Sequence, residues 1–278
     1  MILSSPMTRL CWSLCAWMAW SSSALAQTAP TFTDIGAAAG LTAEGQHHAV
    51  AIGDYNNDGF EDIYVGSKFA PNALYRNNGD MTFTEVGAEA GVADEGFTNA
   101  AIWLDVDNDG DLDLATGNGF GGTGAEPNRF YVNQGDGTFI DMAEAWGLNS
   151  TLMCRSLHAA DYDKDGFTDL YVVNINAVNH FFKNDGGQGF TNVYLQSGTL
   201  DTGVGMGSIF FDYDNDGDQD LYLTHDANQT NKLYRNSGDG TFINLAFFAG
   251  LNYQGNCMGV DVADINHDGW LDLYITDL

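Results

Sequence analysis

The chain has 278 residues, with nine Lys and Arg against 38 Asp and Glu and a formal net charge of −29. Hydrophobic residues make up 44% and aromatic residues 13%, which is enough for a core and excludes an acidic disordered tail. So few cations exclude nucleic acid as a partner and argue against docking on anionic lipid, because both depend on Lys and Arg.

Residues 1–26 have the features of a signal peptide. Arg9 gives a short positive region, Leu10 to Trp20 is an apolar run, and Ala24-Leu25-Ala26 is a small-x-small cleavage signal. The run is shorter than the roughly 20 residues of a membrane span, so a retained anchor is the weaker alternative and no membrane insertion is expected. We expect a mature chain of residues 27–278 that is secreted or periplasmic.

A nine-residue acidic element, Asp-x-Asp/Asn-x-Asp-Gly-x-x-Asp, defines five repeats. The five elements, here loops 1 to 5, begin at Asp54, Asp105, Asp161, Asp212 and Asp264, so by subtraction the starts are 51, 56, 51 and 52 residues apart. A second element with the same spacing begins at Thr31, Thr82, Thr138, Gly189 and Thr241 and ends in Ala-Gly-Leu or a variant. Two unlike motifs that share one irregular spacing indicate a true repeat architecture.

Each repeat predicts four short strands. In repeat 1 these are residues 49–53 before the acidic loop, 63–65 after it, and 74–76 and 83–86, with a turn at Asn78-Gly79-Asp80 between the last two. Four strands in about 50 residues are typical of a β-propeller blade. We therefore predict an all-β fold, a β-propeller with four-stranded blades and about five repeats.

The strand before each acidic loop has two informative positions. Small residues lie five positions ahead of each loop, as expected for an innermost strand: Ala49, Ala100, Ser156, Gly207 and Gly259. The positions just before them are chemically varied: His48, Asn99, Arg155, Met206 and Met258. These strands run toward the acidic loops, so the varied side chains are predicted at the opposite end. We expect a protein or glycan ligand there, near His47, His48, Asn99 and Arg155.

The acidic loops fit calcium. Oxygen ligands at positions 1, 3, 5 and 9, the carbonyl of position 7 and the turn-forming Gly at position 6 can supply most of the six to eight oxygens that Ca²⁺ takes. Magnesium fits less well, and zinc and copper lack His or Cys ligands here. We predict about one Ca²⁺ per repeat, with position 9 bidentate. The predicted ligands are Asp54, Asn56, Asp58, Phe60 and Asp62; Asp105, Asp107, Asp109, Asp111 and Asp113; Asp161, Asp163, Asp165, Phe167 and Asp169; Asp212, Asp214, Asp216, Asp218 and Asp220; and Asp264, Asn266, Asp268, Trp270 and Asp272.

Two other interpretations of the loops are weaker. An EF-hand needs an acid at position 12, where this chain has Val65, Thr116, Val172, Leu223 and Ile275. A polar turn without a metal would cluster carboxylates at a cost in every repeat. The loops hold 21 of the 38 Asp and Glu residues, so the acidity indicates cation sites more than a solvated surface.

The loops, together with Asn-x-Leu-Tyr-x-Asn-x-Gly-Asp-Gly-Thr-Phe at Asn231 to Phe242, resemble the FG-GAP/VCBS repeats of integrin-α-type propellers. The Thr-Phe and Ala-Gly-Leu ends are most similar to the cartilage-acidic-protein (ASPIC/UnbV-associated) branch. The resemblance implies a calcium-stabilised propeller that acts in adhesion or in binding proteins or glycans, without catalysis. Such propellers usually have seven blades, so we expect this chain to be a C-terminally incomplete part of one; a closed five-bladed ring is the alternative.

An enzyme is the alternative function. His158 and Asp261 share an inner-strand position that is apolar in the other repeats, so a polysaccharide lyase or hydrolase would use them, but no nucleophile or oxyanion motif accompanies them. A purely structural role for calcium is the third possibility. Cys154 and Cys257 lie in repeats 3 and 5, and the whole repeat between them disfavours a direct disulfide. We expect two semi-buried thiols, with a bond in an exported chain as the alternative.

Overall fold

The computed structural model describes residues 33–43, 45–119 and 126–278. All strands lie in the unit Gly36–Leu278, which is distinct from Met1–Ile35. The predicted signal peptide, residues 1–26, falls outside the described residues. Among those residues, none of the helices is both long and apolar enough to cross a membrane.

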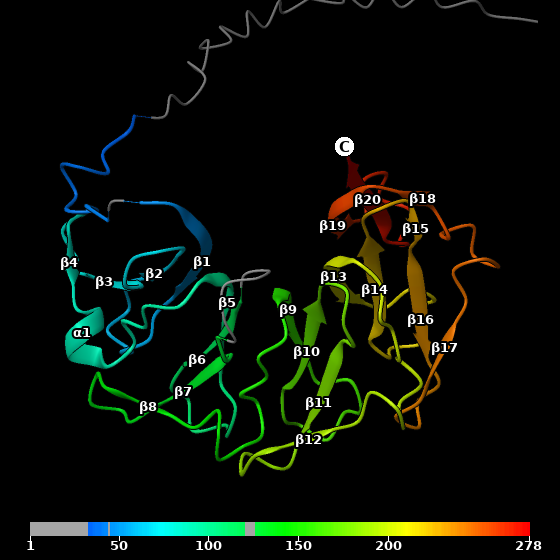
Figure 1. Ribbon diagram of the computed structural model, residues 1–278, viewed down its shortest axis with the longest axis horizontal. Helices are drawn as coiled ribbons and strands as arrows, with labels where there is room; N and C mark the ends of the chain where they lie inside the picture. Colours follow the sequence, from blue (N-terminus) through cyan, green and yellow to red (C-terminus); the bar gives the residue numbers. More distant parts are fainter. Residues whose placement is uncertain (1–32, 44, 120–125) are drawn as a thin grey trace, which may run out of the picture. The chain divides into compact units, whose positions relative to one another are not determined.

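The described chain is built of successive antiparallel sheets, one per repeat (Figure 1). Repeats 1 to 4 each form a four-stranded sheet, and repeat 5 contributes a two-stranded one. The first strands are β1 (His47–Gly53), β5 (Thr98–Leu104), β9 (Cys154–Ala160), β13 (Gly205–Phe211) and β19 (Cys257–Ala263). The second strands are β2 (Asp62–Ser67), β6 (Asp113–Asn118), β10 (Asp169–Asn174), β14 (Asp220–His225) and β20 (Asp272–Asp277).

The outer half of each complete sheet is shorter. The third strands are β3 (Ala73–Asn77), β7 (Arg129–Asn133), β11 (His180–Asn184) and β16 (Lys232–Asn236). The fourth are β4 (Phe83–Glu85), β8 (Phe139–Asp141), β12 (Phe190–Asn192) and β17 (Phe242–Asn244). The remaining elements are the helix α1 (Gly87–Ala90) and a two-stranded pair, β15 (Gln229–Thr230) with β18 (Gln254–Gly255). The four strands predicted for repeat 1 are confirmed, and with them the all-β, β-propeller-like fold.

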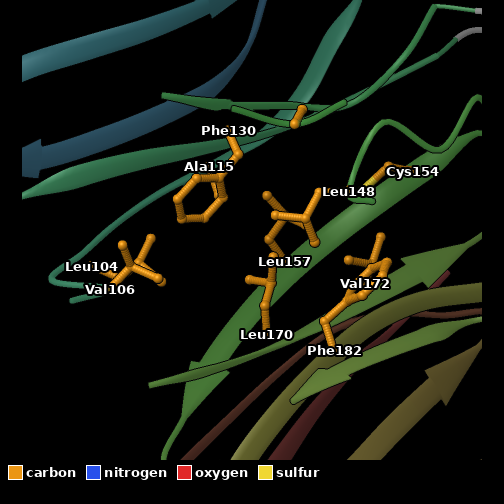
Figure 2. Packing of buried hydrophobic residues seen from close by; sticks show 11 residues of the cluster. Leu104, Val106, Ala115, Phe130, Leu148, Cys154, Leu157, Leu170, Val172 and Phe182 are labelled. Carbon is orange, nitrogen blue, oxygen red and sulfur yellow. The ribbon is translucent and has the colours of Figure 1, made fainter. Parts of the chain in front are cut away.

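The hydrophobic core lies between neighbouring sheets. One cluster joins Leu104, Val106 and Phe130 of repeat 2 to Leu170 and Phe182 of repeat 3 (Figure 2). Equivalent clusters join repeats 1 and 2, and repeats 3 and 4. Each sheet therefore buries its apolar residues against the next repeat, as expected for a stacked repeat fold.

The first strands of successive repeats are packed side by side, β1 on β5, β5 on β9, β9 on β13 and β13 on β19. The predicted small residues allow this approach: a Cβ added to Gly207 would lie 3.1 Å from the Met258 carbonyl oxygen. Cys154 and Cys257 are free, as expected, but both are fully buried. Their predicted partial exposure was wrong, because Cys154 lies in the core cluster between repeats 2 and 3 and Cys257 is covered by Asn231 of repeat 4.

Asparagines at the end of the third strands tie each repeat to the one before it. The Nδ2 atoms of Asn133, Asn184 and Asn236 donate to the carbonyls of Tyr55, Val106 and Tyr162, each at 2.8 Å. Each acceptor is the second residue of the preceding repeat's acidic loop. Loops 1 to 3 are thus each fixed by a hydrogen bond from an asparagine side chain of the following sheet to the loop's main chain.

Candidate functional site

The five acidic loops have one backbone conformation. The first Asp accepts the N–H groups of positions 5 and 6, with distances of 3.1 Å and 2.8 Å in loop 1 and 3.1 Å and 3.0 Å in loop 3. Position 6 is Gly with a φ of 86° to 91°. Position 4 also has a positive φ, at Asn57, Asn108, Lys164, Asn215 and His267. The loop is wrapped around its own first carboxylate, as the sequence pattern predicts.

The ninth position anchors the loop to the sheet. In loop 3, Asp169 is fully buried and accepts the N–H groups of Tyr162 and Asn184 at 3.1 and 2.8 Å. Burial raises the pKa of Asp169 to about 7, and these two hydrogen bonds only partly oppose the rise. Asp113 is the same, with its pKa raised by burial to about 7. Each oxygen thus holds one backbone donor and keeps a second lone-pair direction for another partner.

The third position supplies the clearest sign of a missing partner. In loops 2, 3 and 4 the carboxylates of positions 1, 3 and 9 place one oxygen each within 4.8 Å of one another. The Oδ1 atoms of Asp107, Asp163 and Asp214 are buried there without a hydrogen-bond partner. A buried, unpaired carboxylate oxygen is costly, and a divalent cation bound to three carboxylates would remove that cost. The donor set therefore fits a hard cation.

Loops 1 and 5 form the same turn with a different third ligand. Position 3 is Asn56 in loop 1 and Asn266 in loop 5, so their acids do not form such a triad. In every loop, position 5 accepts the N–H of position 7, at 3.0 Å from Phe60 and 2.9 Å from Trp270. In all five loops, the predicted ligand residues thus lie in one turn of the same form. That they coordinate calcium stays a prediction.

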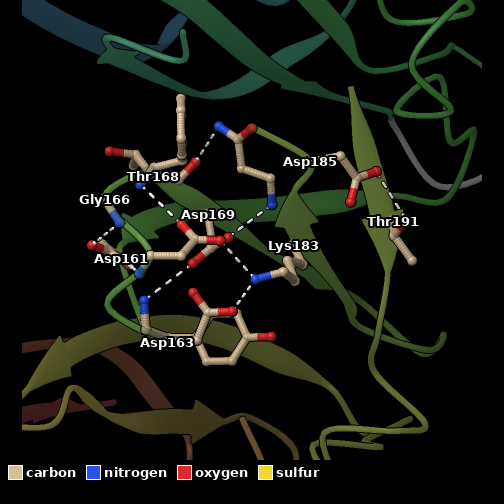
Figure 3. Close-up of polar contacts among 12 residues, drawn as sticks. Asp161, Asp163, Gly166, Thr168, Asp169, Lys183, Asp185 and Thr191 are labelled. Carbon is tan, nitrogen blue, oxygen red and sulfur yellow. Dashed lines mark hydrogen bonds and ion pairs between the residues drawn. The ribbon is translucent and has the colours of Figure 1, made fainter. Parts of the chain in front are cut away.

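A lysine that the loop pattern does not contain enters loop 3. The ammonium of Lys183, on β11, hydrogen-bonds to Asp163 and, at 2.8 Å, to Asp165 (Figure 3). These partners raise the pKa of Lys183 against the opposing effect of burial. In the sequence, Lys183 is the residue just before the Asn that ends the third strand of repeat 3. The equivalent residue in repeat 2 is the uncharged Val132. Loops 2 and 3 therefore differ in local charge although their own residues are similar.

The acidic loops also contact one another. The Nδ2 of Asn57 donates to the Gly110 carbonyl at 3.2 Å, and that of Asn108 donates to the Gly166 carbonyl at 2.8 Å. In loop 3, Lys164 replaces Asn and forms an ion pair of 2.5 Å with Asp218 of loop 4. Position 4 of one loop thus reaches the next loop, so all five loops lie at one end of the sheets.

At the opposite end, the predicted ligand positions are β-bulges. The pairing of the first two strands skips a residue between His47 and Ala49, Thr98 and Ala100, and Cys154 and Ser156. It is also irregular between Gly205 and Ser208 and between Cys257 and Val260. The skipped positions include every member of the varied set, His48, Asn99, Arg155, Met206 and Met258. Bulges redirect side chains and recur beside functional sites.

These bulge residues meet at one cavity. Its volume is about 370 Å³, and all five first strands contribute to its lining, with His48, Asn99, Arg155, Met206 and Met258 among the lining residues. We call it the inner-strand cavity. Among the described residues, Arg155 has no ion pair. The convergence that the sequence predicted is therefore present in the structure.

Two predicted contact residues have other roles. His47 hydrogen-bonds to the Ser67 hydroxyl at 3.1 Å and lies in a separate hollow of repeat 1. Asn99 lines the cavity, but its Nδ2 donates to the carbonyls of Gly119 and Cys154 at 2.7 and 2.9 Å. Asn99 thus joins repeats 2 and 3, which limits what it can offer a ligand.

An aromatic group beside His48 was not predicted. The rings of His48 and Phe97 are 5.3 Å apart, those of Phe69 and Phe97 5.7 Å, and the Lys68 ammonium lies 5.0 Å from the Phe97 centroid. Phe69 is 74% exposed. Isolated apolar residues in loops carry no periodic signal, which is why the sequence did not reveal this group.

The candidate catalytic pair is not assembled. His158 lines the inner-strand cavity, and burial lowers its pKa to about 4. Asp261 is exposed and accepts the N–H of Val262 at 2.9 Å. Both residues lie in the described part of the chain, and no hydrogen bond or ion pair joins them there.

Comparison with known proteins agrees with the repeat pattern. The model of the FG-GAP-like repeat matches residues 54–116, 120–172, 161–223 and 212–275. Cartilage acidic protein 1 of Mus musculus is 28% identical over 223 residues, 76% of this chain and 34% of that protein. The Homo sapiens protein is also 28% identical, over 224 residues, 76% of this chain and 33% of that protein. The chain thus spans about a third of the length of these relatives.

Solved structures resemble the chain more distantly. The biofilm matrix protein Bap1 of V. cholerae has a TM-score of 0.45 and 17% identity, covering 81% of this chain and 34% of its own. BBS1N, from its complex with ARL6DN, has a TM-score of 0.47 and 9% identity, covering 85% of this chain and 64% of its own.

Proposed function

This chain belongs to the FG-GAP-like repeat family, and from that premise we propose that it is an exported, calcium-binding β-propeller that binds a protein or glycan partner. In this proposal, Ca²⁺ occupies the acidic loops, and the partner contacts the opposite end. Export rests on the signal-peptide features of residues 1–26. Extracellular calcium modules work at about 10⁻⁴–10⁻³ M, so loops of modest affinity suffice outside the cell.

The observation that supports the metal sites is the set of buried, unpartnered Oδ1 atoms of Asp107, Asp163 and Asp214. Three acids per site and the absence of His or Cys from these triads favour Ca²⁺ over zinc or copper. When bound, calcium would neutralise the clustered carboxylates and so stabilise the loop against its own repulsion. Asn57, Asn108 and Lys164, which each contact the next acidic loop, would then join loops that calcium has stabilised.

The observation that supports the binding end is the bulge at the same place in every repeat. Side chains of four different types, carried by five strands, are redirected into one cavity. A structural role alone does not require that variety. Arg155, without an ion pair among the described residues in a chain of charge −29, offers a donor to an acidic or hydroxyl-bearing partner.

We place binding ahead of catalysis for this cavity. His158 has its pKa lowered to about 4 by burial, far below the neutral range where a general base works best. General acid–base catalysis also needs a partner in hydrogen-bond reach, and Asp261 does not provide one. A polysaccharide-acting enzyme has no further observation in its favour.

Calcium titration by calorimetry, with melting curves in Ca²⁺ and in chelator, tests the metal sites. We expect several bound Ca²⁺ and a higher Tm with calcium; no bound metal and no change in Tm would refute the proposal. The binding end is tested by screening the calcium-loaded protein on a glycan array and repeating each hit with Arg155→Met. Arg76→Met, which removes an exposed charge on β3, is the control. Hits that survive Arg155→Met would exclude the inner-strand cavity.

A further inference from the structure

A second cavity lies at the same end of the molecule, in repeat 4. Its volume is about 720 Å³, within the usual range of small-molecule sites. The segment Gly198–Gly203, which ends repeat 3, forms one side, and repeat 4 forms the other with residues that include His225, Lys232 and Tyr234. We call it the repeat-4 cavity. It is distinct from the inner-strand cavity, whose lining comes from the first strands.

A buried polar pair forms part of its wall. The Nε2 of His225 and the Oδ1 of Asp201 are 2.9 Å apart, and the two side chains are 1% and 7% exposed. Burial acts to raise the pKa of Asp201, but the hydrogen bond and charge of His225 hold it below its ordinary value. The Nδ1 of His225 is buried and has no hydrogen-bond partner. The wall of the cavity thus contains an imidazole nitrogen that the protein itself leaves unsatisfied.

Further polar groups around this cavity are uncommitted. Among the described residues, the side chains of Thr202, Asn228, Thr230 and Lys232 and the Tyr234 hydroxyl form no hydrogen bond or ion pair. Lys232 is half-buried, and a chain with 38 acids against nine cations offers many possible counter-ions. Its ammonium nevertheless forms no ion pair with a described residue at the cavity, although its charge acts on Asp201 and helps to lower the pKa of that carboxyl.

Comparison with repeat 2 shows that the fold does not impose this state. There the first residue of the third strand is Arg129, which pairs with Asp94 at 3.4 Å and Asp141 at 3.0 Å. In repeat 4 the residue at the place of Asp141 is Asn244, and the residue at the place of Asp94 is Asp201, already bonded to His225. In repeat 4 one counter-ion is therefore replaced by an amide, and the other, Asp201, is hydrogen-bonded to His225 and acts on Lys232 through its charge without forming an ion pair.

Repeat 1 provides a second internal comparison. The equivalent hollow there has a volume of about 430 Å³ and is lined by Ala43, Ala70 and Ala73 where repeat 4 has Asp201, Asn228 and Lys232. Alanine offers neither charge nor hydrogen bonds. The hollow of repeat 1 keeps other polar residues, including His47, Ser67 and Glu85, but it has no cation at the place of Lys232.

We propose that the repeat-4 cavity binds a carboxylate-bearing sugar, a uronate unit of an acidic polysaccharide. The carboxylate pairs with Lys232, and the hydroxyls meet amide and hydroxyl groups such as Asn228 and Thr230, which both donate and accept. The cavity wall already holds the Asp201 carboxylate beside Lys232, so a singly charged carboxylate meets less repulsion there than a dianionic phosphate would. Repulsion from the distant acidic loops is screened beyond about 10 Å at 0.1 M salt. This inference narrows the partner of the proposed function to a chemical class and adds a site for it.

The test uses a matched pair of probes, methyl β-D-glucuronide and methyl β-D-glucoside, which differ in the carboxylate. Binding to the full chain with saturating Ca²⁺ is measured by saturation-transfer NMR titration. We expect the glucuronide to bind more tightly, and Lys232→Met to weaken it by roughly tenfold, the ratio that a loss of about 1.4 kcal/mol gives. Arg76→Met, which removes the same charge from β3, should leave the affinity unchanged.

The other outcomes are decisive as well. Equal binding of the two glycosides, tighter binding of inorganic phosphate, or an unchanged affinity in Lys232→Met with an unchanged Tm would overturn the inference. If Lys232→Met lowers the Tm, Asn244→Asp provides the second variant. It restores the acid of repeat 2 beside Lys232, and it should also weaken the glucuronide.

The proposed function is judged separately. Loss of glucuronide binding in Arg155→Met but not in Lys232→Met would move the sugar to the inner-strand cavity, which contradicts this inference and supports the proposed function. If glucuronide binding depends on Lys232 but the chain binds no calcium, the result supports this inference and contradicts the proposed function.

Discussion

Replacing Asn236 by alanine tests the contact between repeats on which the loop geometry depends. Asn236 is 1% exposed. Its Nδ2 donates to the Tyr162 carbonyl of repeat 3 at 2.8 Å and to the Gln219 carbonyl at 3.2 Å, and its Oδ1 accepts the Gly238 N–H at 3.0 Å. Asn77 is the matched position in repeat 1. It has the last two bonds, to Glu61 and Gly79, both at 3.0 Å, and none to an earlier repeat among the described residues.

The magnitude follows from the bond that the two positions do not share. A typical hydrogen bond contributes about 1 kcal/mol net, and a buried acceptor left unsatisfied costs about 1–3 kcal/mol. Both variants lose the bond to their own loop and the bond in the turn. Asn236→Ala also loses the bond to Tyr162, which is 4% exposed, so we expect its free energy of unfolding to fall by about 2 kcal/mol more than that of Asn77→Ala.

Urea denaturation at fixed calcium and pH, followed by circular dichroism, measures the two free energies. The chain must unfold in one transition for the comparison to be valid, and coincident curves from tryptophan fluorescence check this. Equal losses in the two variants would refute the reasoning, because they would show that the bond between repeats 3 and 4 adds nothing to stability.

Three further outcomes follow from the site. Asp107→Ala should reduce the number of bound Ca²⁺ by one in calorimetry, since it removes the third-position ligand of loop 2, where loops 1 and 5 keep an amide oxygen; an unchanged number would place that ion elsewhere. Lys183→Met should raise the calcium affinity of loop 3 by about tenfold, or about 1.4 kcal/mol, because the ammonium no longer competes for Asp163 and Asp165; weaker binding would show that it supports the site. Burial lowers the pKa of His158 to about 4, from about 6.5 when unfolded, so its contribution to stability is present above about pH 6.5 and is lost as the pH falls toward 4. His158→Gln should therefore show a smaller fall in Tm between pH 7 and 4 than wild type, and an equal fall would contradict the burial argument.

The fold was predictable because the same turn-forming and strand-forming residues recur in every repeat. The Gly at position 6 must take a positive φ to close the loop, and at Gly59 and Gly166 it does, with values of 88° and 91°. Strand order followed from the short connections within each repeat. The varied residues before each loop were also correctly placed together, since the direction of the first strands determines at which end they lie.

What could not be predicted depends on contacts between repeats. Lys183 lies 20 residues from Asp163, and its side chain reaches the loop only because the third strand passes beside it. The role of Asn99 depends on its two carbonyl acceptors, one of which belongs to the next repeat. The repeat-4 cavity likewise depends on Asn244, which stands where repeat 2 has Asp141. The sequence alone does not show that this difference matters, because the ion pair between Arg129 and Asp141 is seen only in the structure.

The two ends of the sheets are under different physical constraints, and this difference supports assigning them different roles. At the acidic-loop end, loops 1 to 3 are each bonded both to the next loop and to the following sheet, so a change in one of them affects its neighbours, and the same loop pattern recurs in every repeat. At the opposite end, the bulge side chains leave the regular pairing, so they can vary without disturbing the strands. Arg155 and Lys232 line cavities at this variable end and form no ion pair among the described residues, although Arg129 at the same end is paired with Asp94 and Asp141. Lys164 and Lys183 are bound to acids at the other end. The acidic end therefore provides rigidity, and recognition is expected where the fold leaves positive charge available.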